Sequence, residues 1–281
     1  MLLSNWRGKK KVNLVHLAKD KQLIASSIGI NLKNTYYTTT RRGMDLETKD
    51  QIESVLVSNP AYGHRRIAMD LRMNKKKILR VMHKFGIKPF RRKFKFFKKQ
   101  DVNTKEISYI NILKVLCPIR ENIVWVSDFT YIKYRGRFIY LSSVQDFHTR
   151  EVLGIGLSRF HDRHLVEEAL RKGEQKAGMS AKYIHSDQGS EYRSFSYKAL
   201  ARELGITISM SDKGSPWQNG QMESFFGRFK EEAGDINRFE SLPELIEYIY
   251  QQVYYYNNKR IHTTLKMAPV QFKQKARRNY S

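Results

Sequence analysis

Two segments of the sequence decide the fold: IHSDQGSEY at residues 184–192 and SPWQNGQMESFF at residues 215–226. The first predicts a short strand over residues 182–186 and then a glycine-containing turn, which leaves Asp187 at the carboxyl end of the strand. The second predicts the start of a helix, because Ser215 is a favourable N-cap and Pro216 suits the first helical position. Glu223 then lies two turns into that helix.

A third carboxylate, Asp128, interrupts the apolar strand pattern VWVSDFTYI at residues 124–132. The sequence has 58 residues between Asp128 and Asp187, and 35 between Asp187 and Glu223. Carboxylates are rarely buried unless they are paired or bind a metal, because removing their charge from water is costly. Oxygen ligands suit Mg²⁺ or Mn²⁺, and two such ions about 4 Å apart can serve an in-line phosphoryl displacement. Any one of these acids could be a turn residue or a helix cap, but the three together favour a metal site.

The three acids and their flanks resemble the DDE catalytic triad of the insertion-sequence-three family of transposases and of retroviral integrases. A gap of 35 residues between the second and third acids is usual in that family. The segments YGHRRI at residues 62–67 and YNNKRIH at residues 256–262 are similar to its upstream helix-turn-helix signature and its carboxyl-terminal signature. One departure is QNG at residues 218–220, where many relatives have Asp-Asn-Ala, so no role is carried over from that aspartate.

The resemblance implies a ribonuclease-H-like catalytic core in which Asp128, Asp187 and Glu223 are the catalytic and metal-binding residues. It implies Mg²⁺ or Mn²⁺ as cofactor, with two ions bound. The expected activity is that of a DNA transposase: cleavage at the ends of an insertion element and strand transfer into target DNA. The expected partners are the terminal repeats, the target DNA, further copies of the chain on the DNA ends, and an upstream-frame product to which this downstream-frame chain can be fused.

Two other functions fit parts of the sequence. A ribonuclease-H-like nuclease would hydrolyse nucleic acid without strand transfer, but the basic region upstream of the acids favours a protein that holds defined DNA ends. A catalytically idle DNA-binding regulator would have no use for an intact triad. The transposase is therefore the favoured interpretation.

The net charge of +25 predicts a polyanionic partner bound through its phosphates. Residues 1–100 contribute +19 of it and residues 101–281 contribute +6. An RNA-binding protein of the ribosomal kind is a weaker interpretation, because three acids lie in the strand-rich carboxyl half. The single cysteine, Cys117, excludes a disulfide framework, and no apolar run is long enough to predict a membrane span. We therefore expect a bacterial protein of the cytoplasm, associated with the nucleoid and not with a membrane.

Residues 1–87 predict a helical DNA-binding region with a helix-turn-helix. Residues 1–40 fit either a degenerate helix-turn-helix or a basic helical arm, with a short helix ending near residue 37. In residues 45–86, Asp45 is expected to cap a first helix that ends at Pro60, and two further helices follow Gly63 and Asn74. The expected DNA contacts are Arg65, Arg66 and an outward basic face of the third helix formed by Lys75, Lys76, Lys77 and Arg80. A merely solvated basic face is the alternative.

Residues 88–118 predict a linker in which basic residues alternate with four phenylalanines. The cations Arg91, Arg92 and Lys93 are expected to contact DNA phosphates, and the aromatic rings can stack on exposed bases. A disordered linker is the alternative, although four phenylalanines count against full disorder.

Residues 119–235 predict an α/β core with the element order βββαβαβα. Strands are expected at residues 122–133, 137–145, 151–157, 182–186 and 207–210, and helices at residues 162–176, at residues 195–204 and around Glu223. Residues 236–281 predict an amphipathic helix at residues 241–256 followed by a basic tail. The predicted domains are thus 1–87, 88–118, 119–235 and 236–281.

Several residues near the triad have open roles. Asn219, Glu223 and Lys230 share one side of the predicted helix, so Asn219 and Lys230 are expected to contact DNA, or Lys230 is simply exposed. Asp146 ends the second strand and could support Asp128 or could stabilise the hairpin turn. The histidines have no metal-ligand spacing, so none is assigned to a metal.

Overall fold

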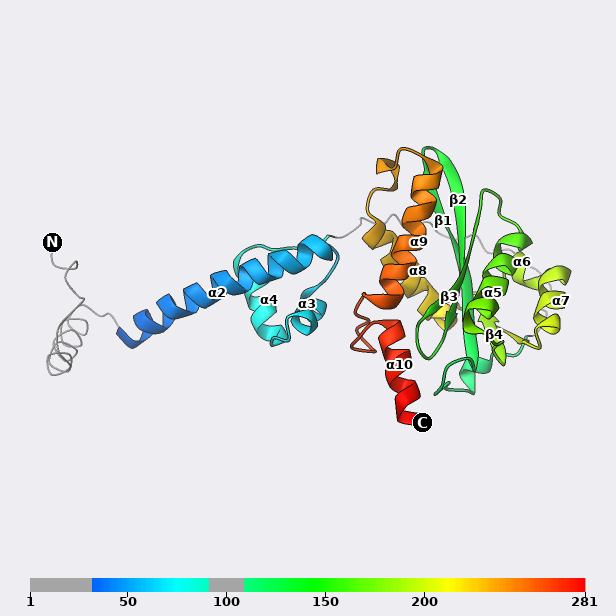
Figure 1. The fold of residues 1–281 in the computed structure, drawn as a ribbon, viewed down its shortest axis with the longest axis horizontal. Helices are drawn as coiled ribbons and strands as arrows, with labels where there is room; N and C mark the ends of the chain where they lie inside the picture. The colour runs from blue at the N-terminus through cyan, green and yellow to red at the C-terminus, as the bar shows by residue number, and fades with distance from the viewer. Residues whose placement is uncertain (1–31, 91–108, 281) are drawn as a thin grey trace.

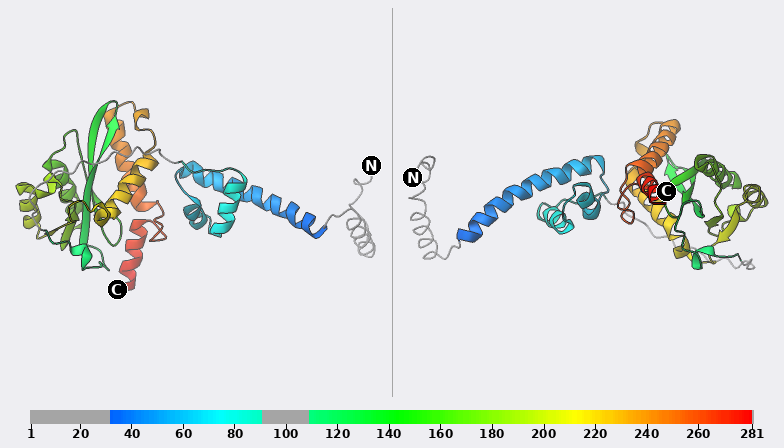
Figure 2. Two further views of the ribbon diagram at one scale, coloured as in Figure 1. Left: turned by 180° about the vertical axis from the view of Figure 1, so that it is seen from behind. Right: turned by 60° about the horizontal axis from the view of Figure 1, so that its bottom comes forward.

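The computed structural model describes residues 32–90 and 109–280 (Figure 1). These residues form a helical unit (residues 32–90) and a sheet unit (residues 109–280), and the long first helix of the helical unit extends away from the sheet unit (Figure 2). Residues 1–31, which make up most of the region predicted to be a degenerate helix-turn-helix or a basic helical arm (residues 1–40), lie outside the described residues, as do the predicted DNA contacts at Arg91, Arg92 and Lys93. Within the described residues, no helix is long and apolar enough to cross a membrane.

The sheet unit is built on five strands in the order β3-β2-β1-β4-β5. The strands are β1 (Val124–Tyr134), β2 (Arg137–Asp146), β3 (Val152–Ser158), β4 (Tyr183–Ser186) and β5 (Thr207–Met210). β1, β2 and β3 form an antiparallel meander, whereas β4 and β5 continue the sheet in parallel with β1. The hairpin between β1 and β2 turns at Arg135 and Gly136, which both have positive φ. The five predicted strands are confirmed to within two residues at each end.

Helices cover both faces of this sheet (Figure 1). On one face lie α5 (Arg163–Ala177), α6 (Ser190–Arg193) and α7 (Phe195–Glu203), and on the other lie α8 (Gly220–Ala233) and α9 (Leu242–Asn258). Neighbouring residues of β1 point to opposite faces. Trp125 therefore packs in the core under α5, α6 and α7, and Val126 packs in the core under α8 and α9. Apart from the four-residue helix α6, the element order is βββαβαβα, and this order with helices on both faces is that of a ribonuclease-H-like core.

Two glycines let α5 pack directly on the sheet. A Cβ atom on Gly154 of β3 would lie 2.1 Å from the carbonyl oxygen of Ala169, and one on Gly156 would lie 2.2 Å from that of Leu165. Any side chain at these positions would push the helix away, which is why strand β3 carries glycine at alternate positions.

The helical unit packs three helices around one apolar core: α2 (Leu32–Ser58), α3 (His64–Asp70) and α4 (Lys75–Lys84). α3, a tight turn and α4 follow the helix-turn-helix plan, and the Asn74 side chain caps α4 by accepting a hydrogen bond from the Lys76 amide. Two predictions here are wrong. No short helix ends near residue 37, because α2 runs unbroken from Leu32, and Asp45 lies inside α2 and does not cap it. The Asp45 carboxylate is buried and binds Arg80 and Lys84 of α4.

The predicted basic tail contains a helix, α10 (Pro269–Tyr280), that lies against the sheet unit. Lys273 contacts Glu151 at 2.9 Å and Arg277 contacts Glu121 at 2.5 Å, so part of the basic charge of this tail is neutralised within the protein. Three short 3-10 helices complete the described elements: η1 (Ile112–Lys114), η2 (Pro216–Asn219) and η3 (Ile236–Arg238).

Candidate active site

Asp128 lies in β1, and Asp187 directly follows the last residue of the adjacent parallel strand β4. β1 and β4 pair in parallel, with Val126 opposite His185, and each aspartate comes two residues after its member of that pair. Because side chains alternate along a strand, residues at equal distances beyond a pair share one face. The parallel register therefore brings together two carboxylates that are 58 residues apart in the sequence.

Hydrogen bonds from the backbone hold both aspartates. Asp128 Oδ1 accepts from the Phe129 amide at 2.8 Å, and Asp187 Oδ1 accepts from the Gly189 amide at 3.0 Å. The hydroxyl of Tyr192 lies close to both carboxylates and to Ser127 Oγ, which is 3.1 Å away. Burial raises the pKa of the Tyr192 hydroxyl well above its usual value, and the charges of Asp128 and Asp187 add to that rise. Tyr192 therefore stays protonated beneath the two aspartates.

The third acid comes from α8, which is anchored to β1 at its start. Asn219 is buried, and its side-chain amide donates a 3.2 Å hydrogen bond to the carbonyl oxygen of Ser127, the residue before Asp128. Glu223 follows one turn later in the first turn of α8 and is exposed. Further along the helix, Lys230 Nζ lies 4.9 Å from the centre of the Tyr131 ring of β1. The predicted start of the helix is partly confirmed: the chain turns helical at Pro216, but the first turn is the 3-10 helix η2, and Ser215 makes no side-chain cap.

The donor set of the triad fits a hard divalent cation. All three side chains offer carboxylate oxygens, which Mg²⁺ and Mn²⁺ prefer over nitrogen or sulfur. Asp128 and Asp187 each come two residues after the last pair of the β1–β4 ladder, and the helix of Glu223 is tied to the same stretch of β1. Over residues 32–90 and 109–280, no three acidic, histidine or cysteine side chains lie close enough together to form a complete metal cluster.

Other polar residues of this region have structural partners. Asp146 accepts hydrogen bonds from the amides of Asn122 and Thr149, so of its two predicted roles the structure supports the hairpin turn. Burial lowers the pKa of His185 to about 4, and its Nδ1 lies 2.8 Å from Ser209 Oγ, so the ring is neutral and belongs to the core.

Sequence reasoning missed a contact between a histidine and a glutamate beside the aspartates. Glu191 is buried, and its Oε1 lies 3.1 Å from Nε2 of His161. A Cβ atom on Gly189 would touch both Glu191 Oε2 and Asp187 Oδ1, so the two acids flank this glycine. No sequence signal links residues 161 and 191, because the loop after β3 brings His161 to this turn only in the folded chain.

The predicted DNA contacts in the helical unit divide into two groups. Arg65, Lys75 and Lys76 are exposed and Lys77 is partly exposed. By contrast, Arg66 is only 8% exposed and donates from Nε to the Ile261 carbonyl oxygen at 3.0 Å, and Arg80 binds Asp45 instead of facing outward. We do not propose DNA contacts for Arg66, Arg80 or the buried Asn219, because partners within the protein occupy them.

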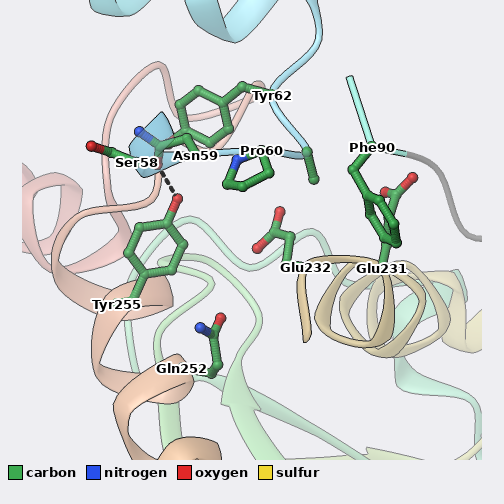
Figure 3. A pocket seen from close by; sticks show the side chains of 10 residues that line it. Ser58, Asn59, Pro60, Tyr62, Phe90, Glu231, Glu232, Gln252 and Tyr255 are labelled. Atoms are coloured by element: carbon green, nitrogen blue, oxygen red, sulfur yellow. Dashed lines mark hydrogen bonds between the residues drawn. The ribbon is translucent and has the colours of Figure 1, made fainter. Parts of the chain in front are cut away.

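The helical unit docks on the sheet unit through the two motifs singled out in the sequence, YGHRRI and YNNKRIH. The Ile261 amide donates to the Tyr62 hydroxyl at 3.0 Å, next to the bond between Arg66 and the Ile261 carbonyl oxygen. Figure 3 shows the neighbouring pocket, in which the Tyr255 hydroxyl of α9 bonds to Asn59 beneath the helical unit. Glu232 of α8 lines the same pocket and binds the buried Arg260 through two 2.8 Å hydrogen bonds. The two motifs thus build the junction between the units.

Known proteins match this chain in sequence. A family model described as Integrase core domain matches residues 118–216, and a second with the same description matches residues 204–269. The transposase for insertion sequence element IS904 of Lactococcus lactis is 32% identical over 68% of this chain and 77% of its own length. The putative transposase InsK for insertion sequence element IS150 of Escherichia coli is 30% identical over 81% of this chain and 83% of its own length.

Among solved structures, the HTLV-2 integrase catalytic core domain in complex with magnesium aligns with a TM-score of 0.46 and 18% identity. The alignment covers 55% of this chain and 98% of that one. The alignment with each of these two transposases covers more than two thirds of the transposase's own length. The chain belongs to the insertion-sequence-three family of DDE transposases, and its enzyme type is a polynucleotidyl transferase.

Proposed function

We propose that this transposase cuts DNA at the ends of an insertion element and joins the freed 3′ ends to target DNA, with Asp128, Asp187 and Glu223 as its catalytic residues. The observation that supports the proposal is the parallel pairing of β1 with β4 up to the Val126–His185 pair, two residues before each aspartate, together with the anchoring of the Glu223 helix at Ser127. A simple nuclease would need the same acids, but the helical unit and its exposed cations favour an enzyme that also holds its DNA ends.

The three carboxylates would hold two Mg²⁺ or Mn²⁺ ions, which supply activation of the attacking oxygen and stabilisation of the leaving oxygen. In the cleavage step the oxygen of a water molecule attacks the phosphorus, the bond from phosphorus to the 3′ oxygen breaks, and the leaving oxygen takes up a proton. In the joining step the freed 3′ hydroxyl attacks a phosphodiester of the target, loses its proton, and displaces the target's own 3′ oxygen. Neither step needs a covalent link to the protein.

Chain residues around the acids have supporting roles in this proposal. Asn219 and the backbone amides of Phe129 and Gly189 set the positions of the carboxylates. Lys230 lies further along the Glu223 helix and would neutralise a phosphate of the DNA end. Lys75, Lys76, Lys77 and Arg65 would bind DNA flanking the cut, and several copies of the chain would act together on paired ends, alone or with an upstream-frame product.

A joining assay tests the proposal. A pre-cut duplex end with a 3′ hydroxyl is incubated with unrelated plasmid DNA, the full chain and Mg²⁺ or Mn²⁺, and the expected product is the end joined to the plasmid. A 3′-deoxy end should give no joined product, because the DNA end itself is the nucleophile. If the chain degraded DNA in a metal-dependent way but joined none, even with the upstream-frame product supplied, the proposed strand transfer would be wrong and the chain would act as a nuclease.

A further inference from the structure

One face of the β1–β2 hairpin carries aromatic and basic side chains that the described helices cover only in part. Tyr131 pairs with Tyr140 and Lys133 pairs with Phe138, so these four side chains share one face, which we call the aromatic face. Tyr131 is 53% exposed and Phe138 is 47% exposed. The hairpin extends beyond α5 on this side, whereas α8 and α9 cover its opposite face (Figure 1).

The aromatic face is an ordered surface. The rings of Tyr131 and Phe138 meet edge to face at 5.2 Å, and Tyr140 stacks on His161 at 5.1 Å. Tyr131 also receives Lys230 of the Glu223 helix on its ring. Rings that already pack against one another lose little freedom when a further flat group stacks on them.

The charge around this face suits a polyanion. Between Phe129 and Gln145 the sequence contains three cations, Lys133, Arg135 and Arg137, and no Asp or Glu. Arg159 follows β3 beside the same surface and is exposed. A second copy of the chain would bring the same cations against this face, which disfavours self-association there.

The position of the face relates it to the triad. Tyr131 lies three residues along β1 from Asp128, which is about 10 Å of strand and about three base steps of DNA. The side chains of Asp128 and Tyr131 leave β1 on opposite faces, but Lys230 reaches the Tyr131 ring from α8. A DNA strand whose reacting phosphate lies at Asp128 could therefore pass over the same edge of β1.

We infer that the aromatic face stacks unpaired bases of the DNA end, so that the last few base pairs are opened when the reacting phosphate lies at the triad. Stacking on aromatic rings is tolerant of sequence, and cations beside the rings hold the backbone of the same strand. The inference rests on the proposed function, since it places the DNA end by the triad.

Binding without divalent metal tests the inference separately from the chemistry. The probes are duplexes of about 20 base pairs and arbitrary sequence, blunt or with a tail of about three unpaired nucleotides that contains 2-aminopurine. The full chain is titrated into each probe in a chelator, and anisotropy and 2-aminopurine fluorescence are recorded. Wild type should prefer the tailed probe about tenfold and quench the fluorophore, as expected for about one stacked base.

Substitutions on the aromatic face distinguish base stacking from contact through apolar bulk. Tyr131→Ala with Phe138→Ala should remove the preference for the tail, and so should Tyr131→Leu, which keeps apolar bulk, whereas Tyr131→Trp should keep it. Phe195→Ala is the matched control, because Phe195 is 89% exposed on α7, away from this face. Unchanged tail preference in the folded double variant and in Tyr131→Leu would overturn the inference. The inference would also be overturned if these substitutions changed the sedimentation of the chain but not its binding to DNA, because the face would then be a protein interface. Failure of the joining assay with these binding results intact would count against the proposed function only.

Discussion

The acids that pair with cations in the helical unit and at its junction with the sheet unit differ in surroundings from the two aspartates near the ends of the β1–β4 ladder. Asp45 binds two cations of α4, and at the junction between the units Glu232 binds the buried Arg260. Asp128 and Asp187 are only partly buried, and each accepts a hydrogen bond from a nearby backbone amide. A carboxylate that holds two helices together serves the stability of the fold, whereas two carboxylates that lie close together repel each other and gain from a divalent cation. Asp45 is therefore a structural acid, and Asp128 and Asp187 are candidate catalytic acids.

The largest expected effect tests the catalytic side of this comparison. Asp128→Asn, Asp187→Asn or Glu223→Gln should each lower strand joining by at least about a thousandfold, because shape is kept but a metal-binding charge is lost. Joined product on a gel measures the activity. The melting temperature and the affinity for DNA should stay close to those of wild type. Joining at the wild-type rate by any one variant would remove that residue from the triad.

The next effect tests a structural acid at the junction. Arg260→Ala should lower the free energy of unfolding by about 3–5 kcal/mol, since it leaves the Glu232 carboxylate buried without its guanidinium. Chemical denaturation of the full chain measures this. Arg202→Ala on α7 is the control, because Arg202 is exposed, and it should change stability little. Equal stability of both variants would mean that the Arg260–Glu232 pair does not hold the junction.

A smaller effect is expected at Asp45 and depends on pH. Arg80 and Lys84 hold the pKa of the Asp45 carboxyl below its usual range. A lowered folded-state pKa means that the stability is present above the unfolded-state pKa, about 4, and is lost as the pH falls further. Asp45→Asn should therefore destabilise the helical unit by about 1–3 kcal/mol at neutral pH, because both cations are partly exposed.

Thermal melts between neutral and acid pH check this prediction. The difference between wild type and Asp45→Asn should shrink as the pH falls below about 4. Asp50→Asn on the same helix is the matched control, because the Asp50 side chain is 75% exposed and its contact with Lys49 is long, at 3.7 Å. A loss of stability as large in Asp50→Asn as in Asp45→Asn would show that the pairing of Asp45 with α4 is not the cause.

The smallest effect is expected at the lysines of α4 that do not bind Asp45. Replacing Lys75, Lys76 and Lys77 by alanine should lower DNA affinity about tenfold and flatten its dependence on salt by about one unit of slope per lost phosphate contact. Filter binding at several salt concentrations measures both quantities. Lys182→Ala, an exposed cation of the sheet unit, is the control and should leave the slope nearly unchanged. If the salt dependence of DNA affinity were unchanged in the triple variant, these lysines would form a solvated basic face that makes no phosphate contacts.

Sequence patterns predicted the sheet well because alternation and turn residues act locally. The strand expected at residues 207–210 has those bounds in the structure, and the helix expected at residues 162–176 begins and ends one residue later. The same patterns gave wrong or incomplete results wherever a charged side chain has a distant partner. Asp45 looked like a helix cap because its partners lie 35 and 39 residues away, and Arg66 looked like a DNA contact because Ile261 is 195 residues away.

By itself, the sequence determined the types of the elements, their order, the three acids and the basic character of the amino-terminal third, since each of these depends on residue type and short spacing. Only the tertiary structure decided that β1 pairs in parallel with β4 up to two residues before Asp128 and Asp187, that Asn219 ties α8 to β1, and that the motifs YGHRRI and YNNKRIH meet. Strand register and the docking of helices depend on contacts between segments far apart in the chain. Hydrophobic periodicity shows which face of a segment is buried, but it does not show which other segment covers that face.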